Sequence, residues 1–253
     1  MDQTNGNLGL TMNEIKSAIS TAGGVDLVLF TAPCLMGGLE SVYQLRDWVD
    51  VYVGSEDLSG YIGWFGTIGY IRNTLETNPE ISNSELGRKI ISSIADNIAL
   101  NESMWNYSYR SIYTMSAVDV KAVPTLAVDV DALARSFLNG QVNFERIYAI
   151  TPNVQGYTGY NIVDLYDFLD KYKATESSPD VQALISKVQE SLNRCVLAEY
   201  HGSGNPGSHG LSIYFPLPSY IKYQPLYSDP QYGLDFAADT KWDEFLKFYK
   251  GIH

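Results

Sequence analysis

The stretch VDLVLFTAPCLMGGLESVYQL, from Val25 to Leu45, decides the fold class. Residues 25–32 are almost all apolar and too few for a buried helix, so they predict a strand inside a sheet that is covered on both faces. Pro33 cannot continue a sheet ladder and ends this strand. Cys34 follows directly, and a helical pattern begins after two glycines. Open α/β sheets bind ligands at this end of a strand. The position of Cys34 is therefore compatible with a functional role and with a structural role, and the pattern alone favours neither.

The elements around this stretch place the chain in the α/β class. Residues 38–49 have the spacing of an amphipathic helix and residues 50–57 that of a strand, which predicts a right-handed parallel crossover. Farther along, helices are predicted over 10–20, 84–101, 124–140, 159–173, 179–198 and 240–251, and strands over 111–120 and 210–216. The first of these helices begins with a capping box made by Thr11 and Glu14.

The composition limits the classes of function. The 253 residues carry 17 Lys and Arg and 29 Asp and Glu, a net charge of −12, and such a surface repels nucleic-acid phosphates. No apolar stretch is long enough to span a membrane. The polar residues 1–11 do not form a signal peptide, whereas the charge-poor, tyrosine-rich composition favours an exported or cell-surface protein. No Cys/His spacing fits a zinc site, so no structural metal of that kind is predicted.

The two cysteines differ in their surroundings. Cys195 lies on an apolar helical pattern and is predicted to be a small buried hydrophobic side chain. Cys34 precedes a helix, whose N-terminus would favour a thiolate there. Gly37 and Gly38 allow the backbone of this segment to approach its neighbours closely.

The segment LFTAPCLMGGLESVYQLRDWVDVYVGSEDLSGYIGW, residues 29–64, resembles the cysteine-bearing segment of the clostripain family, which comprises cysteine endopeptidases with a caspase-like fold (clan CD). The resemblance continues in LTMNEIKSAI, TMSAVDV, NIVDLYDFL, GLSIYFP and LDFAADTKWDEFL, and so covers nearly the whole chain. Its most specific positions are Cys34, Leu35, Met36, Gly37, Glu40, Tyr43, Leu45, Ser55 and Glu56.

The resemblance implies a fold and an activity. The fold would be α/β, with a caspase-like, mixed and mainly parallel sheet flanked by helices. Residues 1–253 would form a catalytic domain that lacks its N-terminal strands, with a helical subdomain at about 121–200. Cys34 would be the catalytic nucleophile, forming an acyl-enzyme with a peptide or protein substrate. The resemblance also allows a calcium requirement.

The chain departs from the family pattern in its histidines. The family histidine precedes the LTMNEIKSAI motif, whereas the histidines of this chain are His201, His209 and His253. Activity is therefore expected to need a histidine-bearing N-terminal segment or light chain, since a cysteine nucleophile works with a nearby base. Recruitment of His201 or His209 from the glycine-rich, flexible-looking loop 201–210 is a weaker alternative. The rival interpretation is a non-catalytic or truncated family member that acts as a binding module or has no activity.

A second departure concerns specificity. Ala32 stands where the family has an aspartate that binds a basic P1 side chain, and alanine cannot form that ion pair. Glu56 and Asp57, at the end of the next strand, are candidates to supply the missing negative charge, and the alternative is that they are solvated loop acids. If the strand that bears the family histidine is absent, the strand 25–32 should have a bare edge.

Overall fold

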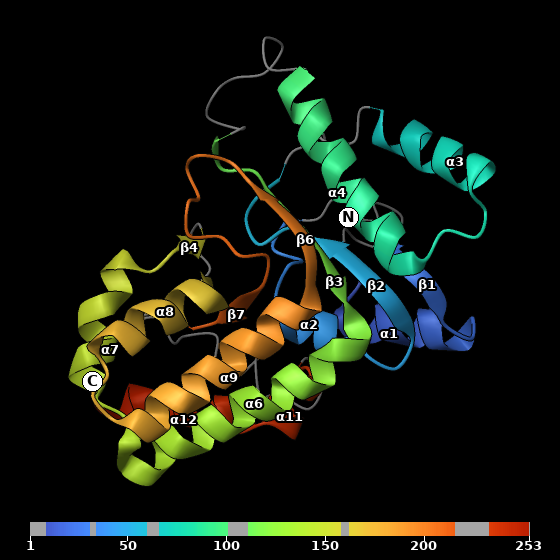
Figure 1. Ribbon diagram of the computed structural model, residues 1–253. Coiled ribbons are helices and arrows are strands. Elements are labelled where there is room, and N and C mark those ends of the chain that lie inside the picture. The colour runs from blue at the N-terminus through green and yellow to red at the C-terminus, as the bar shows by residue number, and fades with distance from the viewer. Residues whose placement is uncertain are drawn as a thin grey trace.

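The computed structural model describes residues 9–30, 34–59, 66–100, 111–157, 162–215 and 233–252 (Figure 1). A four-stranded sheet lies at the centre, in the order β1 (Val25–Leu29), β2 (Val49–Gly54), β3 (Thr114–Asp119) and β6 (Val196–His201). The α/β class with a mixed sheet is confirmed. The expected mainly parallel pairing is found only between β1 and β2, because β3 runs antiparallel to both of its neighbours.

A smaller antiparallel sheet lies beside the first. Its order is β4 (Gly156–Tyr157), β5 (Ile162–Asp164) and β7 (Ser212–Tyr214). The backbone N–H of Ser212 donates to the carbonyl of Gly37 at 2.9 Å, and Gly38 forms an isolated parallel bridge with Ser212. The small sheet is thus attached to the segment that follows Cys34.

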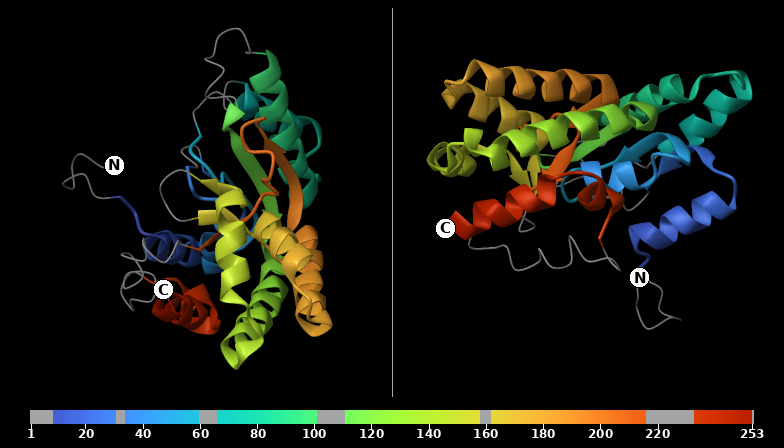
Figure 2. Two further views of the ribbon diagram at one scale, coloured as in Figure 1. Left: turned by 90° about the vertical axis from the view of Figure 1, so that its left-hand side faces the viewer. Right: turned by 90° about the horizontal axis from the view of Figure 1, so that it is seen from below.

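Helices cover both faces of the central sheet (Figures 1 and 2). On one face, α4 packs its apolar side chains, such as Ile90 and Ile94, against Val51 and Val53 of β2. The other face, which includes Tyr52, contributes to a larger core with α2, α6, α9 and α12. The helices are α1 (Met12–Thr21), α2 (Leu39–Gln44), α3 (Thr67–Thr77), α4 (Asn83–Leu100), α6 (Val123–Ser136), α7 (Phe144–Ile150), α8 (Leu165–Thr175), α9 (Pro179–Cys195), α11 (Asp235–Asp239) and α12 (Trp242–Ile252), with the short helical turns Val120–Ala122, Phe137–Gln141 and Thr151–Asn153.

Three elements differ from the sequence prediction. Strand β6 follows α9 at Val196 without a turn, so its apolar residues were assigned to the preceding helix. In the segment 159–173 the helix begins only at Leu165, because the carboxylate of Asp164 accepts a hydrogen bond from the N–H of Asp167 and caps it. Helix α3 was not predicted, because its first residues continue the Gly-, Tyr- and Trp-rich stretch 58–70, which is typical of a loop.

The proposed helical subdomain at 121–200 contains α6, α7, α8 and α9. Their buried side chains belong to the same core as those of α2 and α12. Strand β6, at the end of this range, belongs to the central sheet. The boundary of a separate subdomain therefore stays a prediction.

Strand β1 forms an edge of the central sheet. Among the described residues it pairs only with β2, and Val25 is 39% exposed. Val28 and Phe30 are half-buried, with the Phe30 ring 5.3 Å from that of Tyr52. Within the described part of the chain, β1 thus has a strand partner on one side only, and the absence of the N-terminal strands stays a prediction.

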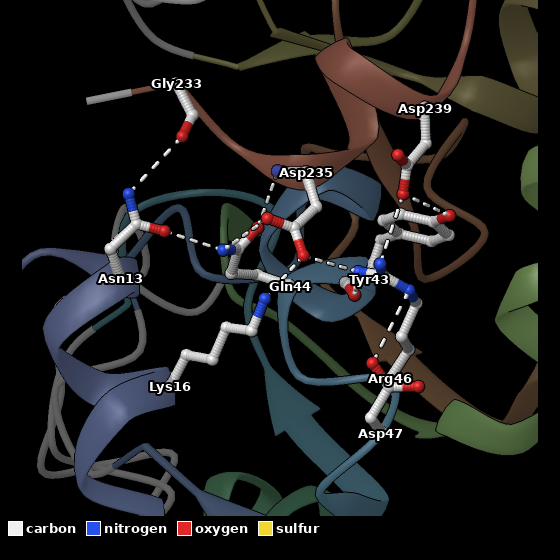
Figure 3. Close-up of polar contacts among 9 residues, drawn as sticks. All are labelled: Asn13, Lys16, Tyr43, Gln44, Arg46, Asp47, Gly233, Asp235 and Asp239. Carbon is white, nitrogen blue, oxygen red and sulfur yellow. Dashed lines mark hydrogen bonds and ion pairs between the residues drawn. The ribbon is translucent and has the colours of Figure 1, made fainter. Parts of the chain in front are cut away.

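The guanidinium group of Arg46 links α2 to α11 (Figure 3). It donates to Asp235 at 2.8 Å and to Asp239 at 3.1 Å, and its carbon lies 4.1 Å from the centre of the Tyr43 ring. Asp235 also accepts a hydrogen bond from Lys16 of α1 at 2.5 Å. Three helices that are distant in the sequence are therefore held together by one half-buried cluster of charges.

We expect Arg46→Ala to lower the free energy of unfolding by about 1–2 kcal/mol, because it removes the cation that two carboxylates share and leaves Asp235 with Lys16 alone. The matched control is Arg72→Ala. Arg72 is 80% exposed and pairs with Glu76 four residues away, so its loss should cost less than about 0.5 kcal/mol. Urea denaturation of both variants measures the difference. Equal effects would show that the cluster adds no more than a surface pair.

Candidate active site

Cys34 lies beyond the carboxyl end of β1, in an exposed loop. Its Sγ donates to the carbonyl of Ser59 at 3.2 Å and accepts from the N–H of Ser59 at 3.3 Å. The predicted position at the end of a strand is confirmed. Helix α2, however, begins only at Leu39, with Gly38 as its cap. The sulfur of Cys34 therefore lies outside the first turn of that helix. The geometry does not support the expected stabilisation of a thiolate by the helix N-terminus.

The loop that carries Cys34 runs along the segment that follows β2. Its backbone is fixed by hydrogen bonds from Leu35 N–H to the Asp57 carbonyl at 3.2 Å and from Gly37 N–H to the Ser55 carbonyl at 2.7 Å. A Cβ on Gly37 would lie 2.8 Å from backbone atoms of Ser55 and Glu56, so only glycine fits there. The sulfur is therefore held between the ends of two parallel strands.

Leu35 adopts a strained backbone conformation. Its φ is 60°, in the left-handed region, which costs about 1–2 kcal/mol for a residue with a side chain. The surrounding hydrogen bonds keep this turn in place. As a result, Leu35 directs the chain from the exposed cysteine back into the core at Gly37.

Glu56 is buried, with 1% of its surface exposed. Its Oε2 accepts from the N–H of Gly210 at 3.0 Å, and its Oε1 has no hydrogen-bond partner among the described residues. The pKa of Glu56 is raised well above its usual value, first because burial penalises the carboxylate and second because the Asp164 carboxylate lies nearby. The sequence patterns did not identify Asp164 as a neighbour of Glu56. The one feature of the sequence that marks Asp164 is its position just before helix α8, which it caps.

Asp57 is also buried, with 3% exposed. Its Oδ2 accepts from the Asn205 side chain at 3.1 Å, and its Oδ1 accepts from the N–H of Leu58 at 2.7 Å. Glu56 and Asp57 therefore lie beside the Cys34 loop but face the interior. Ala32, the third residue predicted to bind substrate, lies outside the described residues.

The loop 201–210 is fixed to the body of the protein. Asn205 and Ser208 are buried, and the N–H groups of Gly202 and Gly204 donate to the carbonyls of Tyr113 and Ser111. The sequence suggested a flexible loop because of its glycines. Those glycines instead allow close packing, since a Cβ on Gly204 would lie 2.8 Å from the Ser111 carbonyl oxygen.

The two histidines in the described part of the chain are paired with carboxylates. His201 is the last residue of β6, which lies three strand spacings, or about 14 Å, from β1 in the central sheet. Its Nδ1 lies 2.9 Å from the carboxylate of Glu199. His209 has Nδ1 3.1 Å from Asp164, and its ring stacks on Tyr166. Among the described residues, no histidine forms a hydrogen bond with Cys34. His253 lies outside that part of the chain.

The buried Glu56 should make the stability depend on pH. Because its folded pKa is raised, the neutral form is favoured, so stability that is present below about pH 4.5 is lost as the pH rises toward the folded pKa. We expect Glu56→Gln, which is neutral at every pH, to be more stable than the wild type at pH 8 by about 1–3 kcal/mol and similar to it at pH 4.5. Denaturation at both values checks this, and a constant difference would contradict it.

His209 acts in the same direction and needs a control. Hydrogen bonding to Asp164 raises its pKa, so its contribution is present below about pH 6.5 and is lost as the pH rises through the folded value. Its ring is 39% exposed, which weakens the effect. Repeating the Glu56→Gln comparison in His209→Gln protein separates the two groups.

The described ranges hold no group of three or more His, Cys, Asp or Glu side chains that could bind a metal ion. No helix in those ranges has the length and apolar character needed to cross a membrane.

Comparisons with known proteins define the class. The sequence model described as "Clostripain family" matches residues 1–249, so the chain belongs to the clostripain family. No protein with a curated description matches the chain. The expected resemblance is thereby confirmed over nearly the whole sequence.

Solved structures of cysteine proteases share the fold. A B. fragilis cysteine protease is 18% identical, with a TM-score of 0.66 over 96% of this chain and 98% of its own. A clostripain from Bacteroides thetaiotaomicron, solved with a peptide inhibitor, is 21% identical, with a TM-score of 0.60 over 92% and 95%. An inactive zymogen C11 protease from Parabacteroides distasonis is 17% identical, with a TM-score of 0.60 over 90% of this chain and 62% of its own.

Proposed function

We propose that the chain is a cysteine endopeptidase in which Cys34 is the nucleophile. The observation that carries this proposal is the exposed thiol, held in a strained loop at the carboxyl end of β1. Membership of the clostripain family supports it. Peptides or proteins would be the substrates.

The reaction needs a proton acceptor and donor besides the thiol. The Cys34 thiolate attacks the scissile carbonyl carbon and forms a C–S bond, the C–N bond breaks, and the leaving amine takes a proton from a histidine. Water then hydrolyses the thioester and regenerates the thiol. Because His201 pairs with Glu199 and His209 with Asp164, we propose that the histidine comes from an N-terminal segment or a light chain.

The second candidate is a non-catalytic member of the family that binds peptides or has no activity. The observation that favours it is that Cys34 bonds only to Ser59 among the described residues. Such a protein would keep the fold and lose turnover.

A peptidase assay separates the two candidates. The chain alone should show little or no turnover of peptides with Arg, Lys or other P1 residues, with or without calcium. The coding sequence upstream of Met1 should contain an in-frame His-Gly after a strand pattern, and co-expression of that segment should restore turnover that Cys34→Ala abolishes. No turnover with the segment present supports the second candidate. Turnover by the chain alone would refute the histidine requirement, and His201→Ala and His209→Ala would then identify the base.

The P1 preference concerns Ala32, Glu56 and Asp57. We propose that Asp57 supplies the negative charge near a basic P1 side chain that Ala32 cannot supply. Glu56 is left out of this role, because burial and the nearby Asp164 raise its pKa and favour its neutral form. Since Asp57 is buried, its effect would be through the electrostatic field of the site. In the restored enzyme, Asp57→Asn should reduce the preference for Arg over Leu at P1, and an unchanged preference would remove Asp57 from the specificity site.

A further inference from the structure

A small cavity of about 170 Å³ lies beside the Cys34 loop. Leu35, the residue after the nucleophile, forms one wall. Ile162 of β5 and Tyr214 of β7 form the wall on the small sheet, and Leu234, just before α11, adds a further apolar surface. Four segments that are distant in the sequence thus meet next to the candidate nucleophile.

The first turn of α2 contributes the polar part of the cavity. Glu40 and Ser41 line it, but Glu40 is 6% exposed and its Oε1 already accepts from the N–H of Tyr214 at 2.9 Å. The carboxylate therefore holds the small sheet against α2. The remaining walls are mainly carbon, which favours an apolar occupant over a charged one.

The volume suits one side chain. An apolar protein cavity of about 150 Å³ holds a benzene molecule, so 170 Å³ accepts a leucine or phenylalanine side chain. The cavity also lies close to the candidate nucleophile, because Leu35, which forms one of its walls, is the residue after Cys34. A peptide extended over Cys34 advances about 3.3 Å per residue, so a residue close to the scissile bond reaches the cavity.

We propose that this cavity, the Leu35 pocket, binds one apolar side chain of the peptide substrate close to the scissile bond and thereby sets specificity. The proposal rests on the proposed function, because it takes Cys34 to be the nucleophile. It adds a specificity site that is separate from Glu56 and Asp57 and that is formed where the Cys34 loop meets the small sheet.

Covalent labelling of Cys34 tests the proposal without requiring turnover. The probes are peptidyl chloromethyl ketones in which one position at a time is Leu, Asp or Lys, and iodoacetamide serves as the reagent without a peptide. For the wild type, we expect Leu to label at least about 10-fold faster than Asp at one position, since burial of an apolar side chain is worth roughly a factor of ten or more.

Two variants should remove this preference by different means. Ser41→Leu fills the pocket from α2, and Ile162→Ser makes its wall polar, so each should bring the Leu/Asp ratio to within about 3-fold at that position. The control is Ile68→Ser, a matched change at a residue 61% exposed on α3, which should leave the ratio unchanged. Equal iodoacetamide rates in all four proteins show that the fold and the thiol are intact.

The outcomes distinguish a failure of the Leu35 pocket from a failure of the proposed peptidase function. Peptidyl probes that react faster than iodoacetamide, but without a Leu preference that the pocket variants change, overturn the pocket and leave the proposed function standing. A Lys preference lost in Glu40→Gln would identify a cation site and also overturn it. Peptidyl probes that are no faster than iodoacetamide would reject the peptide site and the pocket together.

Discussion

Iodoacetamide is expected to modify one thiol of the native protein, that of Cys34. Cys34 is exposed, whereas Cys195 is completely buried at the end of α9, and burial raises the pKa of Cys195 to about 12. The thiolate is the reactive form, so Cys195 should react only when the protein opens. With a stability of about 5–15 kcal/mol, global opening slows this reaction by at least about 10³-fold.

Cys34→Ala should therefore lower the labelling rate of the native protein by about 10³-fold or more, while Cys195→Ala leaves it unchanged. Mass spectrometry of the alkylated protein identifies the labelled residue. In an enzyme supplied with its histidine, Cys34→Ala should also lower kcat/KM by more than about 10³-fold, as for other nucleophiles. Fast labelling at Cys195 in the folded protein would contradict the burial on which this expectation depends.

Phe245→Ala is expected to lower the free energy of unfolding by about 3–5 kcal/mol. Phe245 is completely buried in α12, with its ring 5.0 Å from Phe137 and 5.1 Å from Trp242. The substitution leaves a cavity where α12 joins the core of α6 and α9. Because the surrounding rings are packed from several helices, the cavity cannot close without moving the helices.

The control for this prediction lies on the same helix. Phe248 is 42% exposed and touches Phe144 at 5.3 Å, so Phe248→Ala should cost less than about 1.5 kcal/mol. Urea denaturation with similar slopes for the three proteins measures the difference as stability. A small loss for Phe245→Ala would mean that α12 is not an integral part of the core.

Local sequence patterns predicted the secondary structure correctly where the contacts that stabilise an element are made by residues close in the sequence. The capping box of Thr11 and Glu14 starts α1 as predicted, because both hydrogen bonds lie within three residues. The apolar run before Cys34 forms β1, and the cysteine follows its carboxyl end. The glycines of the loop 201–210 were a less reliable signal, because glycine marks a change of direction and does not show what the chain packs against.

The sequence by itself therefore determined the family, the mixed α/β class, and the position of Cys34 after a strand. The tertiary structure alone decided that β3 runs antiparallel to its neighbours, that Glu56 and Asp57 are buried, and that the Leu35 pocket exists. Those features depend on contacts between segments that are distant in the sequence, such as Glu56 with Gly210, Gly37 with Ser212 and β3 with β6. A side chain's burial and charge state follow from what packs against it, and a local pattern does not contain that information.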